Sequence, residues 1–417
     1  MIYRALLATL ILSMSPMVSA RVPAGESGVS GECTLLVVRA SFDDPRMLQE
    51  LASWIEPWEI DRRAGSVVVG TDEAGVTRLR RAGFRVVIDH ERTRELCAPR
   101  RALKDQASGI PGYPCYRTVE ETFLSAADLA AAWPDLVEIV DIGDSWEKTV
   151  APGSGADLLV LRLTNRSIPG TGTPADPDGK PVLFIMASMH AREYAPAELV
   201  TRFAERLVSA YGDDPEVTWI LDEHEIHILL QANPDGRRKA EQGQLWRKNT
   251  DNEFCSDTSN RGVDLNRNYE YEWGCCGGSS GSECSEIYRG PSPASEPETQ
   301  AVQDYVRQIF PEQWNPLPPD DATGIFLDVH SYGRLVLWAW GYTPDPAPNW
   351  RGTEALGRRM AFLNGHQAFQ AFFFYPTDGT TDDFVYGELG VAAFTFEVGY
   401  RFFEPCLVFE LAILEEN

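Results

Sequence analysis

Short apolar runs alternate with amphipathic helical stretches between residues 124 and 398, and this alternation constrains the fold more than any other feature of the sequence. The predicted strands are 137–143, 157–164, 181–187, 225–236, 324–332 and 391–398, and the predicted helices are 124–136, 197–212, 296–310 and 350–369. Strands that alternate with helices form a parallel or mixed sheet with helices on both faces. We therefore expect an α/β fold whose ligands bind beyond the carboxyl ends of the strands.

A smaller pattern of the same kind precedes it, from Cys33 to about His90. Apolar runs at 34–40, 66–70 and 84–88 alternate with helical stretches at 45–54 and 73–83, which predicts a βαβαβ module. The polar, basic stretch at 90–112 is interpreted as a linker, in which Arg100, Arg101 and Lys104 are expected to be accessible to a protease. The predicted domains are a pro-region or accessory α/β domain with its linker at 21–107 and a larger α/β domain at 108–417.

The first twenty residues, MIYRALLATLILSMSPMVSA, have the pattern of a signal peptide. Arg4 precedes an apolar run from Ala5 to Met14, and small residues end the segment at Ala20. A membrane anchor is the alternative, but spanning a bilayer takes about 20 apolar residues. We expect a secreted protein, extracellular or periplasmic.

The eight cysteines of an exported chain are expected to form disulfides, because the compartment is oxidising and no paired Cys-x-x-Cys motif is present. Since adjacent Cys275 and Cys276 cannot easily bond to each other, each is expected to pair with Cys255 or Cys284, in an order left open. The remaining expected pairs are Cys33 with Cys97 and Cys115 with Cys406.

The charge of the chain disfavours nucleic acid and anionic membranes as partners. The sequence has 37 basic and 62 acidic residues and a formal net charge of −25. Such an excess of negative charge repels polyanions. Acidity serves solubility in many exported proteins, and we infer nothing more specific from it.

Three residues at predicted strand ends form a candidate metal site. His190 and Glu193 follow the run PVLFIMAS, and His330 ends GIFLDVH. Two imidazoles and a carboxylate that leave one position open are the ligand set of catalytic zinc. His224 and His227 are a competing pair, but residues three apart in a strand point to opposite faces.

Five segments resemble the zinc carboxypeptidases, the pancreatic A and B types and their bacterial relatives. They are HAREYA at 190–195, LWRKNT at 245–250, GVDLNRNY at 262–269, VHSY at 329–332 and FTFE at 394–397. The resemblance covers roughly residues 115 to 410 and keeps the family's motif order. It implies one zinc ion, a mixed, mostly parallel sheet of the eight-strand class, and residues 108–417 as the catalytic domain.

The resemblance also implies a role for each motif residue. Glu397 is the expected general base, which takes a proton from zinc-activated water and later delivers it to the leaving amine. Arg247 is expected to stabilise the oxyanion. Asn266 and Arg267 are expected to hold the terminal carboxylate of a peptide substrate. Further substrate contacts are expected from Arg192, Tyr332 and Tyr375.

Specificity is expected to depend on Asp382 at the floor of the substrate pocket. It takes the place where the B-type enzymes carry an acid and the A-type enzymes an apolar residue. A buried negative charge there favours C-terminal Lys or Arg. An Asp in a loop rich in Gly and Thr is also a common turn residue.

Two further expectations concern the ends of the chain. The N-terminal module is similar in type to the family's activation segment, which covers the active site until a protease removes it; a permanent accessory domain is the alternative. After FEPCLVFELAILEEN the sequence stops, whereas the family usually continues into a final helix packed on the sheet. We expect either a truncated sequence or another cover for that surface.

Two other functions are weighed against a carboxypeptidase. One is a deacylase or a cell-wall peptide peptidase on the same scaffold, although Asn266, Arg267 and Tyr375 together favour a free α-carboxylate as ligand. The other is a non-catalytic binding module. Such a module is expected to have lost a metal ligand or the base, and all of them are present.

Overall fold

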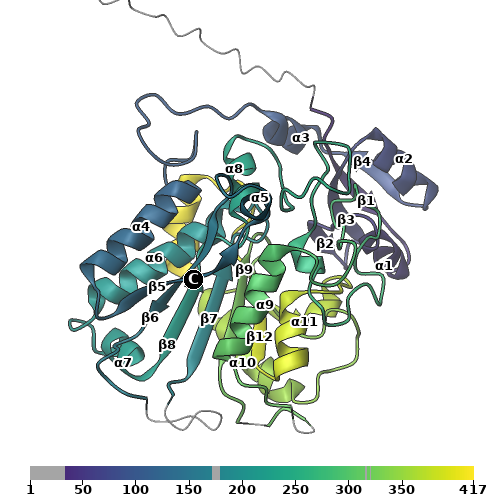
Figure 1. Cartoon of the computed structure of the whole chain (residues 1–417). Helices are drawn as coiled ribbons and strands as arrows, with labels where there is room; N and C mark the ends of the chain where they lie inside the picture. The colour runs from purple at the N-terminus through teal and green to yellow at the C-terminus, as the bar shows by residue number, and fades with distance from the viewer. Residues whose placement is uncertain (1–32, 171–178, 315–316, 320) are drawn as a thin grey trace, which may run out of the picture. The chain divides into compact units, whose positions relative to one another are not determined.

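The computed structural model describes residues 33–170, 179–314, 317–319 and 321–417 (Figure 1). The predicted signal peptide at 1–20 lies outside the described residues. Leu35–Asn417 form one compact unit, which contains a four-stranded and an eight-stranded sheet. Among the described residues, no helix combines the length and apolarity needed to cross a membrane.

The eight-stranded sheet has the order β11-β10-β12-β9-β7-β8-β6-β5. Its strands are β5 (Val137–Asp144), β6 (Asp157–Leu163), β7 (Val182–Ala187), β8 (Glu225–Leu229), β9 (Ile325–His330), β10 (Leu335–Trp338), β11 (Gln367–Gln370) and β12 (Ala392–Glu397). The four strands β12, β9, β7 and β8 run parallel to one another, as do β10 and β11, and the other pairs are antiparallel. The predicted mixed, mostly parallel sheet is confirmed.

Helices cover both faces of this sheet. Figure 1 shows α4 (Val119–Ala132) and α6 (Tyr194–Ala210) on one side of β5–β8, and α9 (Pro297–Ile309) and α11 (Thr381–Phe384) on the other. Between α4 and β12 the structure also has α5 (Trp146–Val150), α7 (Pro215–Glu223), α8 (Pro234–Glu241), η1 (Leu265–Arg267), α10 (Trp350–Asn364), η2 (Ala371–Phe373) and η3 (Val385–Leu389). Each face buries its own apolar cluster, because these strands are covered on both sides.

One predicted helix is too long. We predicted 350–369, but α10 ends at Asn364 and residues Gln367–Gln370 form the edge strand β11. Gly365 caps the helix with a φ of 70°, a left-handed conformation that stops a helix and suits glycine. The apolar residues that follow pair with β10 instead of continuing the helix.

An N-terminal α/β module is present at residues 35–97, a range called the N-terminal module below, and it has one strand and one helix more than the predicted βαβαβ pattern. Its sheet has the order β2-β3-β1-β4, with β1 (Leu36–Ser41), β2 (Glu59–Asp61), β3 (Ser66–Thr71) and β4 (Arg85–Ile88). Its helices are α1 (Arg46–Ala52), α2 (Glu73–Arg81) and α3 (His90–Cys97). Helix α3 corrects our interpretation of 90–97 as linker: its N-cap Asp89 accepts the amide hydrogen of Arg92 at 3.0 Å.

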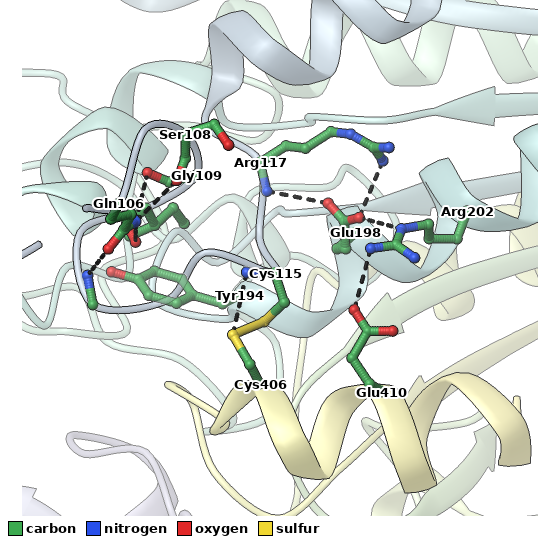
Figure 2. The surroundings of a disulfide bond; sticks show 12 residues. Gln106, Ser108, Gly109, Cys115, Arg117, Tyr194, Glu198, Arg202, Cys406 and Glu410 are labelled. Atoms are coloured by element: carbon green, nitrogen blue, oxygen red, sulfur yellow. Dashed lines mark hydrogen bonds and ion pairs between the residues drawn. A yellow bond between two sulfur atoms is a disulfide. The ribbon is translucent and has the colours of Figure 1, made fainter. Parts of the chain in front are cut away.

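The C-terminal residues are helical, in the segments α12 (Cys406–Val408), η4 (Phe409–Ile413) and α13 (Leu414–Glu416). Phe409 and Ile413 are fully buried in the same cluster as α4 and α6. The predicted disulfide Cys115–Cys406 fastens the start of this segment (Figure 2). Figure 2 also shows an ion-pair chain beside the disulfide, which runs through Arg117, Glu198, Arg202 and Glu410.

The pairing that we predicted for the cysteine cluster is wrong. Cys255 bonds to Cys284, and the adjacent Cys275 and Cys276 bond to each other. Our prediction overlooked a tight turn: Glu272, Gly274 and Gly277 all have positive φ angles. The Asp378 carboxylate holds this turn, because it accepts the amide hydrogens of Cys276 and Gly278 at 3.2 and 2.8 Å. Cys33 and Cys97 are also disulfide-bonded.

Candidate active site

The metal-ligand candidates meet at the carboxyl ends of two neighbouring parallel strands. β7 and β9 pair with Ala187 opposite Val329, so the residues that follow both strands lie at one edge of the sheet. His330 is the last residue of β9, and His190 lies three residues beyond β7. Glu193 is the N-cap residue of α6, where the chain turns back over the sheet. The strand ends bring the three residues together as predicted.

The ligand atoms of these three residues point at one another. Nδ1 of His190 lies 2.8 Å from Oε1 of Glu193 and 3.1 Å from Nδ1 of His330, which is 3.1 Å from Oε2 of Glu193. All three side chains are buried. Metal bonds of about 2.0–2.1 Å at tetrahedral angles separate ligand atoms by about 3.3 Å. The donor set and its spacing therefore fit a zinc ion.

The electrostatics of the cluster favour a positive charge between the three side chains. Burial opposes ionisation of Glu193, but His190 and His330 outweigh it and lower the pKa of this carboxyl. Burial likewise opposes a charge on His330, but Asp328 and Glu193 raise its pKa well above the usual value. A metal cation supplies this charge without a proton.

Glu397 is the last residue of β12 and lies in register with His330 on the adjacent parallel strand. Its side chain is half-buried at the same sheet edge as the three ligand candidates. Desolvation raises its pKa well above the usual value; His330 opposes this shift, and the carboxylates of Glu193 and Glu56 add to it. A carboxyl with a raised pKa is suited to exchanging protons near neutral pH.

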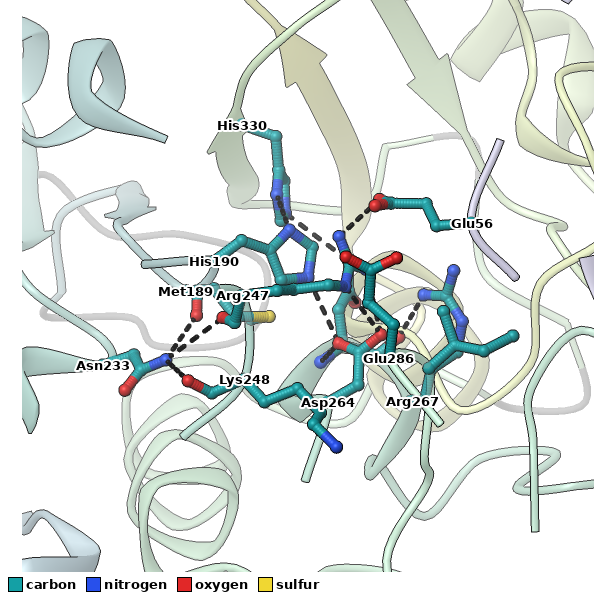
Figure 3. A network of polar contacts seen from close by, with 12 residues as sticks. Glu56, Met189, His190, Asn233, Arg247, Lys248, Asp264, Arg267, Glu286 and His330 are labelled. Atoms are coloured by element: carbon teal, nitrogen blue, oxygen red, sulfur yellow. Dashed lines mark hydrogen bonds and ion pairs between the residues drawn. The ribbon is translucent and has the colours of Figure 1, made fainter. Parts of the chain in front are cut away.

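A buried carboxylate that we did not predict, Asp264, connects His190 with Arg247 (Figure 3). Oδ1 of Asp264 lies 3.2 Å from Nε2 of His190, and Oδ2 accepts hydrogen bonds from Nε and Nη2 of Arg247 at 3.1 and 2.9 Å. Burial raises the pKa of Asp264, but Arg247 and His190 reverse the shift and lower it. Its position two residues before Asn266, inside the motif GVDLNRNY, was the available signal.

The carboxylate-binding candidates lie on η1, directly after Asp264. Nδ2 of Asn266 lies 3.4 Å from Nε2 of His330, and Nη2 of Arg267 lies 3.5 Å from the Tyr375 hydroxyl. Nε of Arg267 is held by the carbonyl oxygen of Gly278 at 2.9 Å. Burial raises the pKa of Tyr375, which therefore stays a neutral donor. The structure thus places Asn266, Arg267 and Tyr375 around one point next to the ligand cluster.

Asp382 lies in α11, and its side chain is buried. Burial and the neighbouring charge of Asp328 raise its pKa. Its neighbour Thr381 donates from its backbone amide to Oδ1 of Asn266 at 3.1 Å. Asp382, the residue predicted for the pocket floor, therefore directly follows a residue that bonds to Asn266.

The N-terminal module contacts the predicted substrate residues. Glu56, which follows α1, forms ion pairs with both Arg192 and Arg247, and Glu286 also pairs with Arg192. The Tyr332 hydroxyl accepts from Nη2 of Arg92 at 2.8 Å and lies 3.0 Å from Oε1 of Glu59. We missed these partners, because no local pattern connects them to the motifs.

Arg62 of the module reaches the segment that carries Tyr375. Its Nε and Nη2 each donate at 3.1 Å, to the carbonyl oxygens of Phe373 and Phe374.

The competing histidines, His224 and His227, lie apart from the metal-ligand cluster. His224 is the C-cap residue of α7 and does not lie in a strand, and buried His227 bonds to the Tyr305 hydroxyl at 2.7 Å. Neither histidine contributes to the metal cluster.

Comparisons with known proteins agree with this geometry. A family model described as zinc carboxypeptidase matches residues 125–406. The "Zinc carboxypeptidase" of Saccharothrix mutabilis subsp. capreolus is 31% identical over 305 residues, which are 69% of this chain and 62% of that protein. Carboxypeptidase A1 of Rattus norvegicus is 29% identical over 324 residues, 75% of this chain and 68% of that protein. The chain thus spans less than two thirds of the first relative.

Solved structures show the same fold at lower identity. Carboxypeptidase A from Helicoverpa armigera superposes with a TM-score of 0.70 at 21% identity and covers 92% of this chain and 95% of its own. Thrombin activatable fibrinolysis inhibitor superposes with a TM-score of 0.67 at 22% identity and covers 91% and 95%. The superpositions cover a larger share of this chain than residues 108–417 represent, so the similarity in fold extends into the N-terminal module.

Proposed function

This chain belongs to the zinc carboxypeptidase family, and from that premise we propose that it is a secreted metallocarboxypeptidase that hydrolyses the C-terminal peptide bond of peptides and proteins. The observation that carries the proposal is the convergence of His190, Glu193 and His330 with Arg267 and Tyr375 at one sheet edge. A metal site alone supports a hydrolase. Its position beside a buried arginine that can bind a carboxylate supports an exopeptidase.

His190, Glu193 and His330 would hold a single zinc ion. A zinc ion in this position supplies Lewis acidity, which polarises the scissile carbonyl and lowers the pKa of water towards neutrality. Glu397 then acts as general base: it takes a proton from the attacking water and later gives it to the leaving amine. The raised pKa of Glu397 supports both proton transfers.

Arg247 would stabilise the oxyanion that develops on the scissile carbonyl. Its guanidinium is buried and is held by two hydrogen bonds to Asp264, so it needs no reorganisation when negative charge develops. The charges of Asp264 and Glu56 outweigh burial and raise the pKa of Arg247, so the guanidinium stays charged.

Arg267 and Asn266 would bind the terminal carboxylate of the substrate, with Tyr375 closing over it. The carbonyl oxygens of Gly278 and Asn266 accept hydrogen bonds from Nε and Nη1 of Arg267 and so orient its guanidinium. Arg192 and Tyr332 would contact substrate residues farther from the cleaved bond. Both now bond to the N-terminal module instead.

Asp382 would select basic C-terminal residues. Its carboxylate is buried, and burial disfavours its charge unless a cation pairs with it. A C-terminal Lys or Arg side chain provides that cation. The neighbouring Asp383 is fixed by the Gly341 amide, which donates to its two oxygens at 2.9 and 3.0 Å, and we assign it a structural role.

The N-terminal module would keep the enzyme inactive until a protease removes it. The Glu56 carboxylate pairs with both Arg192 and Arg247, so these two guanidinium groups are occupied while the module is in place. In the segment that follows α3, Arg101 and Lys104 are exposed, whereas Arg100 lies 3.7 Å above the Phe403 ring. We place the activating cleavage after Arg101 or Lys104.

The proposed function is tested by treating the protein with trypsin and measuring its peptidase activity with and without a chelator. The untreated protein should have little activity on a peptide with a free C-terminus, and trypsin should release activity that falls on chelation and returns with zinc. Undiminished turnover in the chelated, trypsin-treated protein would contradict a zinc enzyme. Full activity before cleavage would contradict only the inhibitory role of the module.

A further inference from the structure

Asp328 is a buried carboxylate directly behind a metal-ligand candidate. It lies in β9 two residues before His330, so both side chains lie on the same face of the strand. Oδ2 of Asp328 is 3.0 Å from Nε2 of His330. The imidazole therefore directs Nε2 at Asp328 and Nδ1 at Glu193 and His190.

The other imidazole has the same arrangement. Nδ1 of His190 points at Glu193, and its Nε2 lies 3.2 Å from Oδ1 of Asp264. In both rings a carboxylate accepts the Nε2 hydrogen, which leaves the lone pair on Nδ1 for a metal. Carboxylates in this position orient a histidine ligand and make it more basic.

Stability of the fold does not account for Asp328. The side chain is completely buried, and among the described residues Oδ1 has no hydrogen-bond partner. A buried carboxylate with one unpaired oxygen costs folding free energy. The Thr381 hydroxyl donates to Oδ2 at 2.7 Å, but a neutral acceptor would satisfy that hydroxyl equally well.

Building on the proposed zinc site, we propose that Asp328 is a positioning residue, which fixes the ring of His330 with Nδ1 towards the metal and links this ligand to the pocket floor through Thr381. Thr381 begins α11, and its backbone amide bonds to Asn266. The same short helix carries Asp382. Asp328 thus connects the metal ligand with the segment that is proposed to select the substrate side chain.

Zinc affinity tests this role independently of turnover. The protein is stripped of metal, and its dissociation constant for zinc is measured by competition with a chromophoric chelator for wild type, Asp328→Ala and Asp328→Asn. Asp235→Asn is the matched control, because Asp235 is also buried and accepts a backbone amide hydrogen, from Glu147 at 2.9 Å. Thermal unfolding of each metal-free variant reports any loss of stability.

We expect Asp328→Ala to weaken zinc binding by about 10- to 100-fold. Asp328→Asn keeps an acceptor oxygen and should weaken zinc binding less than Asp328→Ala does. Asp235→Asn should bind zinc like wild type even if it unfolds at a lower temperature. With zinc at saturation, Asp328→Ala should recover most of its kcat. Thr381→Val should weaken zinc binding less than Asp328→Ala, and Thr381→Ser should match wild type.

The outcomes separate this proposal from the function on which it rests. If wild type binds no zinc, the metal site itself is wrong. If wild type binds zinc and Asp328→Ala binds it equally tightly, Asp328 does not position His330. A loss of preference for C-terminal Arg with unchanged zinc affinity would assign Asp328 to the pocket charge and would also overturn the proposal.

Discussion

Glu56 forms an ion pair with Arg247, although 191 residues separate the two in the sequence. Glu56 lies in the N-terminal module, and Arg247 lies next to the metal-ligand cluster, bonded to Asp264. While this buried ion pair is in place, a substrate oxyanion has to displace Glu56 to reach Nη1 of Arg247. The relationship therefore connects the fold of the module directly with the activity of the site.

Glu56→Gln is expected to activate the uncleaved protein. Loss of the charge takes one of two carboxylate partners from each arginine, because Arg247 keeps Asp264 and Arg192 keeps Glu286, and breaking a buried ion pair typically costs about 3–5 kcal/mol. We expect at least about tenfold more peptidase activity before trypsin treatment, measured as initial rates. Glu50→Gln, at an exposed position of the same module, should stay inactive. Equal rates for the two variants before cleavage would show that Glu56 does not block the site.

Arg267→Lys is expected to raise KM for peptides with a free C-terminus. Lysine keeps the charge but cannot form two parallel hydrogen bonds to a carboxylate. Loss of one charge-assisted bond, worth about 1.5–3 kcal/mol, predicts a fall in kcat/KM of roughly 10- to 100-fold. Assays on C-terminal amides supply the comparison, since they lack the carboxylate. A loss of the same size on amides would mean that Arg267 acts on something else.

Asp382→Asn is expected to remove a preference for C-terminal Arg over Leu. The buried carboxylate pairs with a basic side chain, and its neutral amide does not. Because the pKa of Asp382 is raised, the wild-type preference for Arg should grow as the pH rises and the carboxyl ionises. The ratio of kcat/KM for Arg and Leu substrates between about pH 5 and 9 measures both effects. A wild-type ratio near one at every pH would rule out basic specificity.

Glu298→Gln is expected to stabilise the protein at alkaline pH. Burial and the charge of Glu296 raise the pKa of Glu298 to about 8 from its ordinary value of 4.5. The folded protein therefore binds more protons than the unfolded chain between these values, and stability falls as the pH rises through this window.

Thermal unfolding at pH 4.5 and at pH 8 tests whether the stability of the wild type falls as the pH rises. Glu298→Gln should raise Tm at the higher pH by about 2–4 °C for each kcal/mol gained and should change it little at the lower pH. Exposed Glu415→Gln serves as control. An equal shift at both pH values would indicate a packing effect and not a titration.

Local patterns in the sequence were sufficient for six of the eight strands of the larger sheet and for the ligand candidates, but they did not predict β10 or β11. His330 and Glu397 each end an apolar run, and a parallel sheet places such ends at one edge. The predicted ends of helices and strands were wrong where a tertiary contact or a helix cap determines the end. Helix α3 has no buried residue, so its amphipathic signal was weak, and strand β11 followed a helix that Gly365 ends.

Partners from distant segments could not be predicted in the same way. Glu56 and Arg192 are 136 residues apart, and no periodicity connects a loop of the N-terminal module with a strand end of the larger sheet. Asp328 was different, because it stands two residues before His330 in a strand and so had to share its face. That signal was present in the sequence and was overlooked.

Release of C-terminal residues by the trypsin-treated protein, followed by mass spectrometry, tests the proposed function most directly. Wild type should shorten a peptide acid one residue at a time and leave the peptide amide intact. Glu397→Gln should still bind one zinc ion but lose about 10²- to 10⁴-fold in kcat, because the base is gone. Cleavage of the amide at the same rate as the acid, or wild-type turnover by Glu397→Gln, would contradict a metallocarboxypeptidase with Glu397 as its base.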